Sequence, residues 1–76
     1  MRASPMVYRV SYVVRGQVRG KKHPGLMRDE DRAPDVGEQV EIAGDLFRIT
    51  EIQELIPPLA GFTFLHATCE WVPGAA

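Results

Sequence analysis

The chain has 76 residues, of which 45% are hydrophobic and 25% charged, and its formal net charge is −1. This length allows one domain, residues 1–76, with a thin core, which excludes a deep substrate cavity. The composition excludes a disordered chain, and the short apolar runs exclude a membrane-spanning helix, which needs ~20 apolar residues.

The first predicted element is a strand over residues 7–15, rich in β-branched and aromatic residues. Its two faces carry Tyr8, Val10, Tyr12 and Val14 on one side and Arg9, Ser11 and Arg15 on the other. Gly16 allows a turn, after which residues 17–22 return as a short basic strand. These two strands predict a hairpin with a positively charged outer surface.

A break follows at residues 23–25, His-Pro-Gly, because proline lacks an amide donor and glycine permits positive φ. Residues 26–34 have no clear periodicity and include the acidic stretch that begins at Asp29. We expect a loop or a single helical turn there. Long loops in a small domain are often functional.

The pattern from residue 34 onward predicts a second hairpin. Residues 39–42 alternate as a strand, residues 43–45 form a tight turn, and residues 46–54 form the return strand. Phe47 and Ile49 share a face, whereas Ile52 is out of step with them. A β-bulge near Thr50 would bring Ile52 back to that face.

Residues 57–61, Pro-Pro-Leu-Ala-Gly, are expected to form a loop, because proline cannot donate to a central β-ladder. Residues 62–72 form the last predicted strand. Its expected core face carries Leu65, Ala67, Cys69 and Trp71, and its other face carries Phe62, Phe64, His66, Thr68 and Glu70.

These elements predict an all-β fold, a small SH3-like or similar barrel of four or five strands with little helix. Residues 36–52 resemble the turn–strand–turn–strand unit common in SH3-like barrels. The resemblance covers about a quarter of the chain and rests on glycine placement and alternation, so it indicates an architecture and no particular family.

Charge is divided unevenly along the chain. Residues 1–28 hold seven basic residues and no acid, whereas residues 29–76 hold ten acids against Arg32 and Arg48, so the two parts carry +7 and −8. The parts can neutralise each other in the fold, or they can present charged surfaces to a partner. The candidate partner-binding residues of the basic hairpin are Arg15, Arg19, Lys21, Lys22, His23 and Arg28.

A second candidate surface is the expected apolar loop. Its candidate partner-binding residues are Ile56, Pro57, Pro58, Leu59 and Phe62. Surface loops are usually polar, so an apolar loop either closes one end of the barrel or contacts another protein.

The chain offers no catalytic or metal-binding constellation. His66 and Cys69 are three residues apart, which on a strand places them on opposite faces, and Cys69 is expected to be a buried apolar side chain. The acids around Asp31 lack the spacing of a calcium loop. We therefore expect no enzyme activity, no metal and no cofactor.

The sequence predicts a non-catalytic protein-interaction module, either a regulatory or an inhibitory subunit, including one that a phage would encode. Its expected partner is another protein or a second copy of itself, and no membrane. The alternative is a nucleic-acid-binding module that uses the basic hairpin, with Tyr8 and Tyr12 available to stack on bases. The absence of a signal peptide and the lone cysteine favour the cytoplasm.

Overall fold

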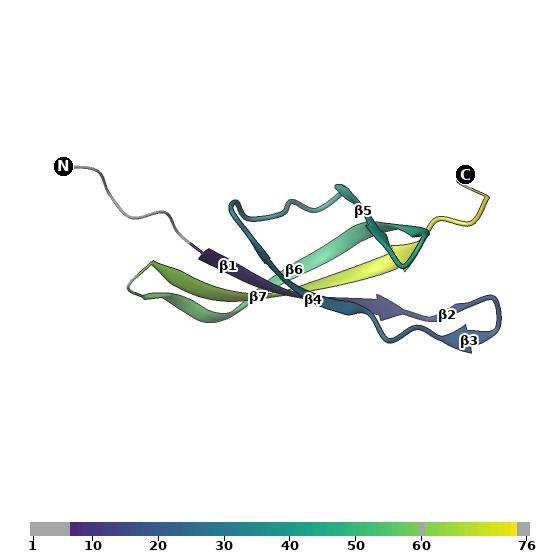
Figure 1. Ribbon diagram of the computed structural model, residues 1–76, viewed down its shortest axis with the longest axis horizontal. Coiled ribbons are helices and arrows are strands. Elements are labelled where there is room, and N and C mark those ends of the chain that lie inside the picture. Colours follow the sequence, from purple (N-terminus) through teal and green to yellow (C-terminus); the bar gives the residue numbers. More distant parts are fainter. Residues whose placement is uncertain (1–6, 60, 75–76) are drawn as a thin grey trace.

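The computed structural model describes residues 7–59 and 61–74, and for residues 56–59 it describes the backbone only. These residues form strands, turns and bends, and none of them belongs to a helix that could traverse a bilayer. The strands are β1 (Val7–Arg15), β2 (Gln17–Val18), β3 (Lys21–Lys22), β4 (Leu26–Glu30), β5 (Gln39–Ile42), β6 (Asp45–Leu59) and β7 (Phe62–Trp71) (Figure 1).

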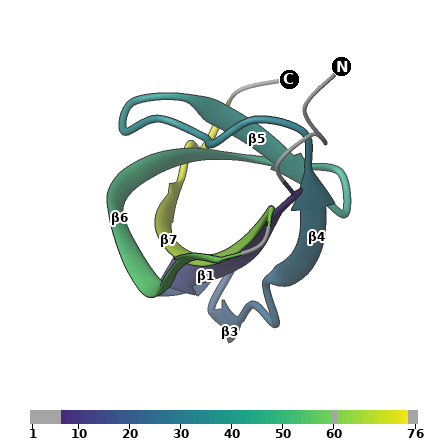
Figure 2. The same cartoon turned by 90° about the vertical axis from the view of Figure 1, so that its left-hand side faces the viewer.

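Five strands form one sheet in the order β4-β1-β7-β6-β5, and β2 and β3 form a separate two-stranded hairpin. Strands β1 and β7 are parallel, and every other pair is antiparallel. The sheet curls around its inner face as a half-barrel, and residues 31–38 connect the two edge strands, β4 and β5 (Figure 2). The predicted small barrel-like all-β fold is therefore confirmed.

The core lies on the concave side of the sheet and follows the alternation in the sequence. Its buried apolar residues are Val10, Tyr12, Val18, Val40, Ile42, Phe47, Ile49, Leu65, Ala67 and Cys69. The partly buried Tyr8, Val14, Ile52 and Trp71 pack against them. The predicted core faces of residues 7–15 and 62–72 are therefore confirmed.

The predicted bulge near Thr50 is also confirmed. Ile49 pairs with Cys69 and Glu51 pairs with Thr68, so Thr50 is the extra residue in β6. This residue changes the phase of the strand and lets Ile52 pack against the same core as Ile49. The tight turn before β6 has positive φ at both Ala43 (54°) and Gly44 (86°), as a two-residue hairpin turn of type I′ requires.

The prediction that residues 17–22 pair with β1 is wrong. Gly16, at φ 80°, bends the chain out of the line of β1, and residues 17–22 fold onto themselves as the β2–β3 hairpin. The partner of β1 is β4, in a segment expected to be a loop or a helical turn. Its pairing is reinforced by charge, because Arg9 Nε lies 2.8 Å from Asp29 Oδ1 across the two strands.

The expected loop at residues 57–61 is also wrong for most of its length, because β6 continues through both prolines to Leu59. The β6–β7 register shifts between Ile56 and Leu59, and β5 pairs only with the first residues of β6. Pro57 and Pro58 thus lie at an irregularity on a strand edge, where a missing amide donor is tolerated. Ala60 lies outside the described residues.

Candidate functional site

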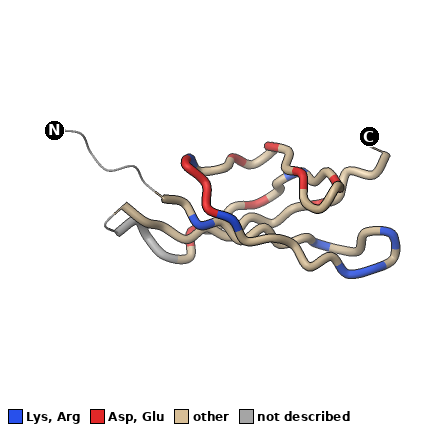
Figure 3. The backbone as a smooth tube through the Cα atoms, viewed as in Figure 1, with Lys and Arg blue, Asp and Glu red and all other residues tan. Residues whose placement is uncertain are grey.

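The predicted basic residues do not form one continuous surface. Arg15 ends β1, Arg19, Lys21 and Lys22 lie in the β2–β3 hairpin, His23 follows that hairpin, and Arg28 lies in β4. We call the β2–β3 hairpin, residues 17–22, the lysine finger. It projects at one end of the molecule and carries several of the basic residues, while others lie elsewhere (Figure 3).

Several contacts fix the lysine finger and the residues that follow it to the body of the protein. Val18 is buried in the core, and the His23 ring packs edge-on against Phe47 with 5.0 Å between ring centroids. The backbone amide of Gly25 donates to Nδ1 of His23 at 3.0 Å. A Cβ added at Gly25, whose φ is 72°, would overlap the carbonyl oxygen of Tyr12, so only glycine fits this close approach.

The arginines in and beside the finger lie near carboxylates of the same chain, closely at Arg19 and loosely at Arg15. Arg19 Nη2 lies 2.6 Å from Asp45 Oδ1, and its guanidinium lies over the Trp71 ring, 5.3 Å from the centroid. The hydrogen bond from Arg19 lowers the pKa of Asp45 below its ordinary value. Arg15 lies 3.9 Å from Glu51 and 3.7 Å from Glu70.

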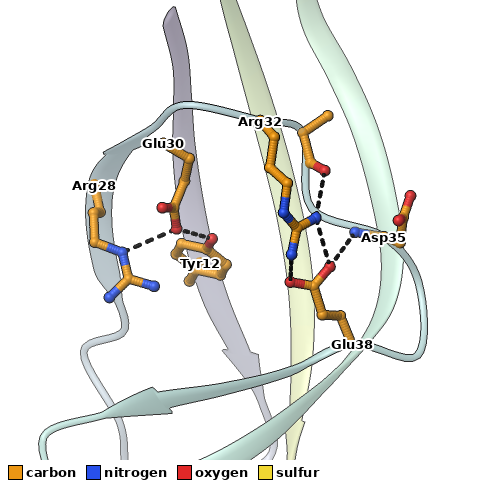
Figure 4. Close-up of polar contacts among 7 residues, drawn as sticks. Tyr12, Arg28, Glu30, Arg32, Asp35 and Glu38 are labelled. Carbon is orange, nitrogen blue, oxygen red and sulfur yellow. Dashed lines mark hydrogen bonds and ion pairs between the residues drawn. The ribbon is translucent and has the colours of Figure 1, made fainter.

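Arg28 belongs to a separate cluster on β4 and β1 (Figure 4). Its Nε donates to Glu30 Oε2 at 3.0 Å, and the Tyr12 hydroxyl donates to the same oxygen at 2.6 Å. Burial, followed by the hydrogen bond to Glu30, raises the pKa of Tyr12 to about 12. Tyr12 is buried and Tyr8 is half-buried, so Tyr12 offers no stacking platform for a base.

Lys21 and Lys22 differ from these arginines. Both are exposed, and neither makes an ion pair with any residue that the structure describes. They pair with Val18 and Gln17 across the hairpin, so as consecutive strand residues they project to opposite sides of the finger. The finger therefore carries two free ammonium groups on a backbone that is held in place.

The second predicted surface is only partly described. The side chains of Ile56, Pro57, Pro58 and Leu59 lie outside the description, whereas Phe62 is half-buried on the outer face of the sheet. There it pairs with Val7, and the Arg9 guanidinium lies 5.6 Å from its ring centroid. Binding by this segment stays a prediction.

The connection between β4 and β5 holds a polar cluster that sequence reasoning missed. Arg32 Nη2 lies 2.6 Å from Glu38 Oε2, and the amide of Asp35 donates to Glu38 Oε1 at 3.0 Å (Figure 4). These donors, Arg32 first, lower the pKa of Glu38. A cavity of about 80 Å³ lies beside them, lined by Tyr12, Glu30, Asp31, Arg32, Pro34 and Glu38.

The groups that line this cavity and the thiol of Cys69 are largely held by hydrogen bonds or by burial. The acidic and basic groups that line the cavity are largely paired with each other, as their hydrogen bonds show. Cys69 is fully buried, and burial raises the pKa of its thiol to about 11, so it remains protonated at neutral pH. Across residues 7–59 and 61–74, no three His, Cys, Asp or Glu side chains are grouped to hold a metal ion.

Comparison of the chain with protein-family models, with curated proteins and with solved structures finds no match.

Proposed function

We propose that this protein is a non-catalytic interaction module that docks onto an acidic surface of another protein through the lysine finger. The observation that supports this most is the contrast within one cluster of cations. Arg15 and Arg19 have carboxylates of their own chain, whereas Lys21 and Lys22 have none among the described residues.

The anchored backbone favours binding as well. Val18, His23 and Gly25 hold the finger before any partner arrives, so little backbone entropy is lost when a complex forms. Two free cations at the end of a net acidic molecule also orient it toward a negative surface and accelerate encounter. A small module of this kind suits a regulatory or inhibitory subunit.

Nucleic acid is the weaker alternative. Affinity for a phosphate backbone grows with the number of phosphates that are neutralised, and the finger offers two unpaired cations that project in opposite directions. Its neighbouring Arg19 would have to leave Asp45, and the Tyr12 side chain is buried in the core.

The test is affinity capture with three forms of the protein, namely wild type, Lys21→Ala/Lys22→Ala, and Arg48→Glu. Both variants lower the net charge by two, and Arg48 is an exposed arginine on β6 without an ion pair to a described residue. We expect wild type and Arg48→Glu to retain the same protein, and the double variant to lose it. Carbodiimide coupling, which joins a lysine amine to an activated carboxylate as an amide, should link Lys21 or Lys22 to acidic residues of that protein.

Two results would contradict the proposal. Equal capture by the double variant would show that the finger is not the binding site. Capture that nuclease abolishes, with affinity that falls steeply as salt increases, would establish nucleic acid as the partner.

A further inference from the structure

Strand β6 has a long free edge. It spans 15 residues, Asp45–Leu59, but β5 pairs only with Asp45–Arg48. Two further hydrogen bonds, from the Gly37 amide to the Ile49 carbonyl and from the Ile49 amide to the Glu38 carbonyl, extend this pairing to Ile49. Beyond Ile49, the described part of the chain places β7 on one side of β6 and no strand on the other (Figure 2).

The first part of that edge is regular. After the bulge at Thr50, residues 51–54 pair one by one with residues 68–65 of β7, and the next shift lies between Glu54 and Ile56. We call residues 51–54 the β6 edge. A regular edge presents unpaired amides and carbonyls that can accept an additional strand, and this is a recurrent way of binding extended peptides.

The charges on the β6 edge restrict what can pair with it. Glu51 and Glu54 are exposed, and Glu54 makes no ion pair with a described residue. The only described cation near Glu51 is Arg15, at 3.9 Å, and both side chains are more than half exposed, so this contact is weak. Two copies paired through this edge would bring glutamates together, which disfavours self-association.

We infer that the β6 edge accepts an extended, basic segment of a partner as an added antiparallel strand. Such a strand would continue the line of β5, which already occupies the preceding part of the same edge in that direction. Lysine or arginine opposite Glu51 and Glu54 would satisfy both carboxylates. An apolar residue opposite Ile52 would extend the core face, on which Ile52 already packs.

This pairing defines a sequence pattern for the partner segment. Along the added strand, the residues opposite Glu54, Gln53, Ile52 and Glu51 are basic, unrestricted, apolar and basic. The β6 edge is distinct from the lysine finger. It requires a basic partner segment, whereas the finger requires an acidic one, so each proposal can be wrong without the other.

The test is fluorescence anisotropy with a labelled ten-residue peptide whose centre is Lys-Thr-Val-Lys. We expect Glu54→Lys to weaken binding about tenfold, because one attractive cross-strand pair becomes repulsive. The matched control is Glu41→Lys, which makes the same charge change at an exposed glutamate of β5. A peptide with the centre Glu-Thr-Val-Lys should restore binding to Glu54→Lys, a gain that misfolding cannot produce.

A second measurement locates the added strand. Peptide binding should slow amide hydrogen exchange within residues 51–54, and Lys21→Ala/Lys22→Ala should bind the peptide as wild type does. The inference is wrong if the peptide does not bind, if it binds without protecting residues 51–54, or if Glu41→Lys weakens binding as much as Glu54→Lys.

Discussion

The lysine finger and the β4–β5 connection are both charged segments outside the main sheet, but they use their charge differently. In the connection, Arg32 and Glu38 satisfy each other, and Glu38 also accepts from the Asp35 amide. In the finger, packing fixes the backbone while Lys21 and Lys22 have no partner among the described residues. The comparison indicates that paired charge holds the connection, whereas packing and the Arg19–Asp45 pair hold the finger and leave its two lysines unpaired among the described residues.

The largest expected effect on stability comes from a substitution that displaces the finger. Gly25→Ala would overlap the Tyr12 carbonyl and place alanine at a φ of 72°, so we expect a loss of about 2–4 kcal/mol in the free energy of unfolding. Gly16→Ala is the matched control, because its φ is 80° but no atom lies within 4 Å of the added Cβ. Urea unfolding should give a loss of about 1 kcal/mol for the control. Equal losses would show that contact with Tyr12 does not hold the finger.

The next effect tests Tyr12, which lines the cavity beside the connection. Tyr12→Phe removes the hydrogen bond to Glu30, and we expect it to cost about 1–2 kcal/mol. The pKa of Tyr12 is raised from 10.0 to about 12. The protonated Tyr12 hydroxyl therefore makes its full contribution to the free energy of unfolding below pH 10, and this contribution is lost as the pH rises through 12. Thermal melts from pH 9 to 12 should show this loss in wild type and in Tyr8→Phe but not in Tyr12→Phe.

A smaller effect is expected from the ion pair of the connection. The pKa of Glu38 is lowered from 4.5, mainly by Arg32. The ionised carboxylate of Glu38 therefore stabilises the fold fully above pH 4.5, and this stabilisation is lost as the pH falls through the lowered pKa. Arg32→Gln should make the acid-induced fall in melting temperature shallower between pH 6 and 3. Arg48→Gln, which removes an exposed arginine without an ion pair, should leave the acid profile unchanged.

The smallest effect is expected at the tip of the finger. Lys21→Ala/Lys22→Ala should change the free energy of unfolding by less than about 0.5 kcal/mol, because neither side chain has a partner to lose. Urea unfolding beside Gly25→Ala measures this directly. A loss above about 1 kcal/mol would mean that the lysines stabilise the fold, and the contrast between the two regions would disappear.

The sequence predicted the features that depend on neighbouring residues. Alternation identified the core faces of β1 and β7, and the phase change between Ile49 and Ile52 located the bulge at Thr50. Strand β4 was missed because its residues are mostly exposed and lack an alternating apolar pattern. Its pairing with β1 depends on contacts such as Arg9–Asp29, between residues 20 positions apart.

The candidate site was harder to predict for the same reason. Which cations remain free depends on the strand register, since Arg19 finds Asp45 26 positions away whereas the adjacent lysines find no carboxylate. The uneven distribution of charge allowed both neutralisation and presentation, and the structure shows close ion pairs at Arg19 and Arg28 and a weak one at Arg15. The sequence did not predict that β6 continues through Pro57 and Pro58, because this depends on which edge of the sheet the two prolines occupy.

The central parallel pair has a consequence for how this chain acquires its structure. Strand β7 lies between β1 and β6, so without it the sheet would divide into two hairpins, β1–β4 and β5–β6, that share no ladder. The β1–β7 contacts join residues 55 positions apart, from Val7↔Phe62 to Arg15↔Glu70, and such separation slows folding. On the ribosome, the first hairpin would wait with an exposed apolar face until β7 is synthesised, which makes the unfinished chain prone to aggregation.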